Sequence, residues 1–150
     1  MLNVFDVVAF ILDKQSPMTA MKLQKIVYYC QVWSIVWDEE PLFKEKIEAW
    51  ANGPVVRSLY EHYRGQYLVS NITKGDKKLL NRKQKETVSS VLSYYGDKTS
   101  QWLSDLTHME DPWRLARKGI QEGDRSSMEI SLASIEEYYS SLPLDEPAVN

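Results

Sequence analysis

The stretch THMEDPWRLARKG (residues 107–119) holds the residue types and spacing that come closest to a catalytic site in this sequence. His108 stands three residues before Asp111, and two arginines follow. A general base must reach a substrate and is usually oriented by a partner such as a carboxylate. Asp111, however, is well explained as the N-cap of a helix that begins with Pro112. We therefore interpret His108 as a structural residue that satisfies backbone groups at the corner between two short helices.

Metal and thiol chemistry have few candidate residues. The chain contains one cysteine, Cys30, and two histidines, His62 and His108, with no pair at ligand spacing. A zinc site usually needs three or four ligands. Cys30 lies on the apolar face of a predicted helix, where a thiol lacks the activation that a nucleophile requires. We expect no metal, no cofactor and no enzymatic activity.

Two stretches have some features of anion-binding sites. NGPVV (residues 52–56) places a glycine before a predicted helix, but Pro54 removes an N–H donor and no phosphate-binding motif surrounds it. The segment Lys74–Glu86 carries six basic and two acidic residues without interleaved aromatic residues, and the whole chain has a net charge of −3. A helix start and a solvated helix face explain these features better. A nucleic-acid-binding regulator of a phage or prophage is therefore an alternative function that these features disfavour.

Length and composition indicate a single soluble domain. The chain has 150 residues, of which 43% are hydrophobic and 26% charged, as in an ordinary globular protein. The longest apolar run near the N-terminus, Val7–Leu12, is far shorter than the ~18 residues of a membrane span. A single cysteine fits a reducing compartment, and the first residues lack the basic start of a signal peptide. We expect a bacterial or phage protein of the cytoplasm without membrane contact.

Hydrophobic periodicity predicts a mainly α-helical fold, a compact domain over residues 1–142 with about six to seven helices. The predicted helices cover residues 3–14, 20–37, 54–64, 82–95, 100–106, 112–118 and 131–141. Lys46–Ala51 is predicted as a short strand, with which Tyr67–Asn71 could pair, so the β element has at most two or three strands. Residues 143–150 are predicted to form a flexible tail.

Capping residues support several of these boundaries. Thr19 can accept a backbone N–H at the start of the second helix, and Asn81 with Gln84 resembles a capping box. Pro54 suits the first position of a helix that Gly65 would end in the left-handed conformation. These signals place a helix start at each of the three positions.

Four stretches occur together in the order and spacing of a known family. They are MTAMKLQKIVYYCQ (18–31), PLFKEKIEAWANGPVVRSLY (41–60), LSDLTHMEDPWRLARKG (103–119) and MEISLASIEEYY (128–139). The sequence resembles the Panacea domain of phage-associated proteins, which includes SocA-like and GepA-like proteins. The residues that carry the resemblance are Lys22, Leu23, Lys25, Tyr28, Trp50, Gly53, Pro54, Val55, His108, Pro112 and Trp113.

The resemblance implies an antitoxin of a toxin–antitoxin system. Such a protein neutralises, by direct protein–protein binding, a cognate toxin that an adjacent gene encodes. A proteolytic adaptor that delivers the toxin to a protease is the alternative that the resemblance also implies. Members of the family are not known as enzymes, and the resemblance leaves open whether the chain forms a homo-oligomer.

Binding a toxin requires a surface with anchor residues. A standard interface buries ~800 Å² on each partner and places aromatic side chains at its centre. The sequence has five tryptophans and nine tyrosines, which can serve at an interface or in the core. The candidates with the right chemistry for partner binding are Tyr29, Trp33, Tyr60, Tyr63 and Tyr139.

Overall fold

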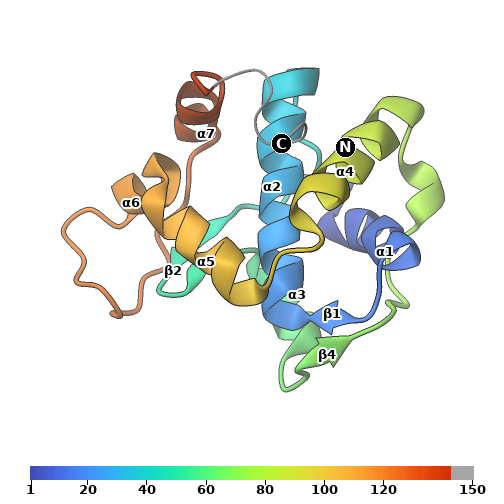
Figure 1. Ribbon diagram of the computed structural model, residues 1–150, viewed down its shortest axis with the longest axis horizontal. Coiled ribbons are helices and arrows are strands. Elements are labelled where there is room, and N and C mark those ends of the chain that lie inside the picture. The colour runs from blue at the N-terminus through green and yellow to red at the C-terminus, as the bar shows by residue number, and fades with distance from the viewer. Residues whose placement is uncertain (143–150) are drawn as a thin grey trace.

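A computed structural model describes residues 1–142 of the chain, and helices account for most of its regular structure (Figure 1). The helices in this range are α1 (Val4–Lys14), α2 (Ala20–Asp38), α3 (Arg57–Tyr63), α4 (Arg82–Tyr95), α5 (Ser100–Met109), α6 (Asp111–Ala116), α7 (Leu132–Tyr139) and the 3-10 helix η1 (Lys77–Leu79). The strands are β1 (Met18–Thr19), β2 (Glu48–Trp50), β3 (Gly53–Val55) and β4 (Leu68–Val69). The predicted mainly α-helical domain is confirmed. The predicted tail, 143–150, lies outside the described residues.

Helix α2 forms the centre of the molecule. It contacts α1, α3, α4, α5 and α7, and in Figure 1 it stands between α1 and α4 on one side and α5, α6 and α7 on the other. Its side chains are buried on nearly every face, as expected for a helix surrounded by others. Thr19 caps its first turn as predicted, since its Oγ1 accepts a hydrogen bond from the backbone N–H of Lys22 at 3.0 Å.

The predicted capping box at the start of α4 is confirmed. Asn81 Oδ1 accepts from the backbone N–H of Gln84 at 2.9 Å, and Gln84 Oε1 accepts from that of Asn81 at 2.8 Å. Val88 and Val91 of this helix are fully buried, and the helix packs against α2. The helix ends at Tyr95, directly before Gly96.

The predicted helix start at Pro54 is wrong. Pro54 lies in β3, which pairs with β2 in an antiparallel hairpin, and α3 begins only at Arg57. Gly53 has a φ of 127°, and a Cβ atom there would lie 2.5 Å from Lys25 Cε. Ala51 and Asn52 form the two-residue turn, and Gly53 opens β3 opposite Trp50, so the hairpin prevailed over the helix signal of Gly-Pro. The predicted strand over residues 46–51 is confirmed as β2.

The predicted pairing of Tyr67–Asn71 with the strand at 46–51 is also wrong. β4 pairs with β1, with Thr19 opposite Leu68. The chain after α3 returns to the start of α2, and that long-range contact leaves no local signal in the sequence. On its other side, β2 meets residues 128–130: Ala49 N–H donates to Met128 O, and Ile130 N–H donates to Ile47 O, both at 2.8 Å.

The region of α5 and α6 differs from the prediction in two details. Helix α5 extends to Met109, so His108 lies in its last turn rather than in a corner. Asp111 is the first residue of α6 and not its cap, because Glu110 takes the N-cap position without a capping hydrogen bond. The Glu110 carboxylate is turned inward and accepts hydrogen bonds from two tyrosines. Among the described residues, no helix is long and apolar enough to cross a membrane.

Candidate functional site

The turn of the β2–β3 hairpin is held from inside by the segment 104–117. Four consecutive backbone carbonyl oxygens, of residues 49 to 52, each meet a side chain of this segment. The pairs are Arg117 Nη1 with Ala49 O (3.0 Å), Trp113 Nε1 with Trp50 O (2.8 Å), His108 Nε2 with Ala51 O (3.0 Å) and Ser104 Oγ with Asn52 O (2.8 Å). We call these four contacts the hairpin clamp. The hairpin clamp joins residues that lie far apart in the sequence into one structural unit.

His108 has a structural position in this clamp. A carbonyl oxygen only accepts, so the Nε2 atom of His108 carries the proton and donates to Ala51 O. Its ring packs edge-on against Trp113, with 4.0 Å between ring centroids. Within residues 1–142, no group of three or more His, Cys, Asp or Glu side chains is arranged to hold a metal ion. Cys30 is fully buried, and burial raises the pKa of its thiol, which disfavours the thiolate.

Arg117 is a clamp residue that the sequence analysis noted only as an arginine near His108. It is buried, and its guanidinium donates to the carbonyls of Ala49, Gln121 and Asp124 while lying 5.2 Å from the centroid of a Trp113 ring. The arginine thereby ties the loop after α6 to β2. An arginine one helical turn after a tryptophan is a weak signal, since most arginines are exposed.

Lys25 is a buried cation beneath the same hairpin. Its side chain is packed against Gly53, where a Cβ atom would lie 3.3 Å from Lys25 Nζ and 3.2 Å from Thr107 Oγ1. Within residues 1–142 it forms no salt bridge with a carboxylate. Desolvation lowers the pKa of Lys25 to about 8.

The other residues that carry the family resemblance also build the scaffold. Lys22 Nζ donates to Gly96 O at 2.6 Å and so ties the start of α2 to the end of α4. Tyr28 is buried, and its hydroxyl lies 3.0 Å from that of Tyr139. Leu23, Pro54, Val55 and Pro112 are buried. Trp50 contributes its backbone carbonyl to the clamp and its ring to the surface.

Four of the five candidate partner-binding residues are buried in the core. Tyr29, Trp33, Tyr63 and Tyr139 are at most 6% exposed. Tyr29 and Tyr139 donate to Glu110 Oε1 at 2.6 and 2.7 Å, and burial raises the pKa of both hydroxyls, so both remain donors. Internal hydrogen bonds satisfy the polar atoms of these aromatic side chains, which is why they fit the core and are not available at the surface.

Tyr60 is the candidate that stays at the surface, with 41% of its area exposed. Its ring meets Trp50 edge-on at 4.9 Å, and the Arg57 guanidinium lies 5.4 Å from the centroid of a Trp50 ring. Glu48 accepts hydrogen bonds from Arg57 Nη2 at 2.7 Å, Arg57 Nε at 3.1 Å and Trp50 Nε1 at 2.9 Å. We call Glu48, Trp50, Arg57 and Tyr60 the Trp50 cluster.

The hydrogen bonds within the Trp50 cluster keep Glu48 ionised. Partial burial acts to raise the pKa of Glu48, but the donors of Arg57 and Trp50 outweigh it and lower the pKa below its usual value. The carboxylate thus holds the tryptophan and the arginine in one arrangement at the surface.

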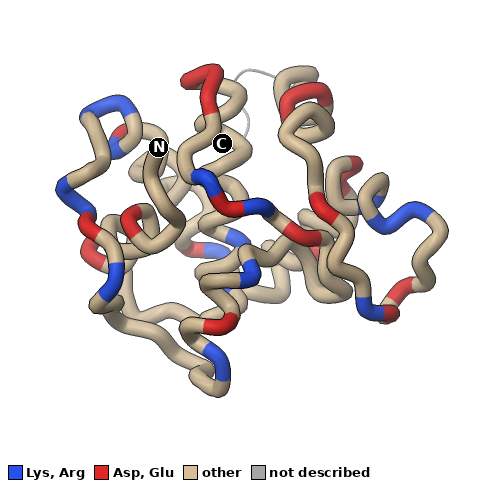
Figure 2. The backbone as a smooth tube through the Cα atoms, turned by 180° about the vertical axis from the view of Figure 1, so that it is seen from behind, with Lys and Arg blue, Asp and Glu red and all other residues tan. Residues whose placement is uncertain are grey.

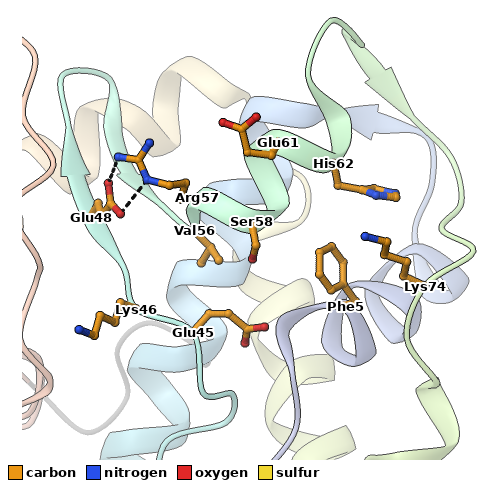
Figure 3. A pocket seen from close by; sticks show the side chains of 10 residues that line it. All are labelled: Phe5, Glu45, Lys46, Glu48, Val56, Arg57, Ser58, Glu61, His62 and Lys74. Atoms are coloured by element: carbon orange, nitrogen blue, oxygen red, sulfur yellow. Dashed lines mark hydrogen bonds and ion pairs between the residues drawn. The ribbon is translucent and has the colours of Figure 1, made fainter.

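A groove of about 720 Å³ adjoins the Trp50 cluster, between α3 and the first turn of α1 (Figure 3). We call it the α1–α3 groove. Glu48 and Arg57 belong to both features. At one end of the groove, the centroids of the Phe5 and His62 rings lie 5.5 Å apart. Lys74 Nζ lies 5.1 Å from the centroid of the Phe5 ring. Glu45 accepts from the backbone N–H of Val4 at 2.8 Å.

Acidic positions lie among the basic ones along the backbone (Figure 2), and three basic residues of the segment 74–86 form ion pairs. Lys77 Nζ lies 2.8 Å from Asp13 Oδ1, and Arg82 Nε lies 3.3 Å from Glu86 Oε1. Lys83 Nζ lies 4.0 Å from Asp38 Oδ1. These ion pairs neutralise part of the positive charge on this face, which fits the interpretation of a solvated helix surface.

The chain matches a known protein family. The family model described as "Antitoxin SocA-like, Panacea domain" matches residues 23–114. The chain belongs to this family. No curated protein and no solved structure gives a significant match. The matched part of the Panacea domain runs from α2 into α6 and contains the hairpin, three of the four clamp side chains and the Trp50 cluster.

Proposed function

We propose that this protein is the antitoxin of a toxin–antitoxin pair and neutralises its cognate toxin by direct protein–protein binding. The Trp50 cluster is the observation that carries the proposal, because tryptophan, tyrosine and arginine dominate the binding energy at protein interfaces. The family supports a toxin as the partner. In this proposal the protein performs no chemical reaction, and both proteins act in the bacterial cytoplasm.

The hairpin clamp supports this role because it fixes the strand that carries Glu48 and Trp50 of the cluster. Trp50 places its carbonyl oxygen against Trp113 inside the molecule and its ring against Tyr60 and Arg57 outside. Side chains that are ordered before binding lose less conformational entropy when the complex forms. A scaffold built from family residues can therefore present a rigid anchor to a partner.

The proposal is tested by co-expression with the protein that the adjacent gene encodes, followed by purification of the complex and a growth-rescue assay. Tyr60→Ala should weaken binding at least about tenfold and reduce rescue, as expected for an anchor residue. Tyr67→Ala is the matched control, because Tyr67 is 77% exposed and lies outside the cluster.

Two other results would contradict the proposal. Absence of a complex with the wild-type protein would refute direct binding. Rescue that requires a protease, accompanied by a falling toxin level, would instead establish the adaptor role, since an antitoxin that acts by occupancy leaves the amount of toxin unchanged.

A further inference from the structure

One end of the α1–α3 groove carries a positive charge that no described carboxylate neutralises. Lys74 Nζ lies over the Phe5 ring and forms no salt bridge within residues 1–142. His62 lies beside the same ring, and Figure 3 shows the two side chains at the same end of the groove. A carboxylate at this end would meet a lysine, an aromatic ring and an imidazole.

The backbone at Lys74 is fixed on the first turn of α1. A Cβ atom on the next residue, Gly75, would clash with the carbonyl group of Phe5. The backbone N–H of Asp76 donates to Asp6 Oδ1 at 2.7 Å. These contacts keep Lys74 at the groove, although its side chain is exposed.

The remaining charges of the groove select against a polyanion. Three carboxylates line it, those of Glu45, Glu48 and Glu61, and its other two basic residues, Lys46 and Arg57, are paired with Glu129 and Glu48. The phosphates of a nucleic acid would have to pass these carboxylates, whereas a single acidic side chain next to Lys74 would not. The volume of about 720 Å³ lies within the range of ligand sites and suits a short polypeptide segment.

We infer that the α1–α3 groove receives a segment of the cognate toxin in which an Asp or Glu side chain pairs with Lys74 and an apolar side chain packs on Phe5. This inference rests on the proposed function. It extends the Trp50 cluster into one continuous interface, because Glu48 and Arg57 border the groove as well as the cluster.

The test measures the dissociation constant between the purified full-length protein and its toxin by calorimetry at physiological salt. Lys74→Glu should weaken binding at least about tenfold through charge repulsion, whereas Lys74→Arg should stay within about threefold of the wild type. Lys85→Glu is the matched control: it makes the same change at an exposed lysine of α4 outside the groove, and it should leave binding unchanged. Equal melting temperatures of the variants confirm that all of them are folded.

Equal toxin affinity for Lys74→Glu and the wild type would overturn this inference and leave the proposed function intact. Loss of nucleic-acid binding or of self-association in Lys74→Glu, with toxin affinity unchanged, would assign the groove to another occupant and overturn it as well. Absence of toxin binding by the wild type would refute both. Restored affinity between Lys74→Glu and a toxin variant with a lysine in place of its acidic residue would establish the pairing.

Discussion

His108 Nε2 donates a hydrogen bond to the carbonyl oxygen of Ala51, 3.0 Å away and 57 residues earlier in the chain. The contact joins the end of α5 to the turn of the β2–β3 hairpin. His108, which Asp111 follows three residues later in the sequence, thus donates a side-chain hydrogen bond to a backbone carbonyl. Its partner is a carbonyl group that its own sequence neighbourhood does not contain.

His108→Gln should lower thermal stability and leave toxin neutralisation intact. Weakening the bond to a partly buried carbonyl costs ~1–3 kcal/mol, which corresponds to roughly 2–4 °C in melting temperature per kcal/mol for a domain of this size. Thermal denaturation and growth rescue at matched expression would check this. A folded variant that binds the toxin and fails to neutralise it would show that His108 has a functional role.

Trp113→Ala should destabilise the protein by about 3–5 kcal/mol, because it leaves a cavity and removes the bond to Trp50 O. A domain is typically stable by only about 5–15 kcal/mol, so the variant should accumulate poorly. Trp102→Ala provides the comparison, since Trp102 is 40% exposed. Equal denaturation midpoints for the two variants would contradict a core role for Trp113.

Lys25→Met should stabilise the protein at pH 7. The pKa of Lys25 is about 8 in the folded protein and 10.5 in its unperturbed state, so between these values the unfolded chain binds more protons. Stability from this residue therefore rises as the pH increases from about 8 to 10.5, and the folded protein carries a penalty of up to about 3 kcal/mol below pH 8.

The measurement for Lys25 is the difference in unfolding free energy between wild type and Lys25→Met from pH 7 to pH 10. The gain from the variant should be largest at pH 7 and should shrink as the pH rises. Using the difference removes the contribution of the tyrosines, which titrate in the unfolded chain near pH 10. A difference that does not change with pH would mean that Lys25 keeps its ordinary pKa.

Joint substitution of Lys77, Lys78, Arg82 and Lys83 by Ser should leave toxin rescue nearly unaltered. Lys77 and Arg82 form exposed ion pairs, which contribute little to stability, and Lys83 reaches the largely buried side chain of Asp38 only at 4.0 Å. Pull-down at low and high salt would check the result, because binding to phosphates weakens steeply with salt. DNA or RNA binding that disappears in this variant, without any protein partner, would favour the nucleic-acid regulator instead.

The sequence by itself determined most of the helices, because their signals are local, although the start of α3 was misplaced at Pro54. Apolar residues at helical spacing and the caps of Thr19 and Asn81 act within a few residues, and they correctly placed α2 and α4. The same reasoning assigned His108 and Cys30 to the scaffold, since neither has partners for chemistry nearby in the sequence. The family resemblance also rested on four short continuous stretches, which can be read directly from the sequence.

Only the tertiary structure decided which aromatic residues reach the surface. Tyr29 and Tyr60 look alike in the sequence, but Glu110, 81 residues away from Tyr29, accepts a hydrogen bond from the Tyr29 hydroxyl in the core, whereas Tyr60 packs on the half-buried Trp50. The pairing of β4 with β1 and the hairpin clamp likewise depend on residues brought together from distant parts of the chain. Burial and partner choice are properties of these long-range contacts, and no local pattern encodes them.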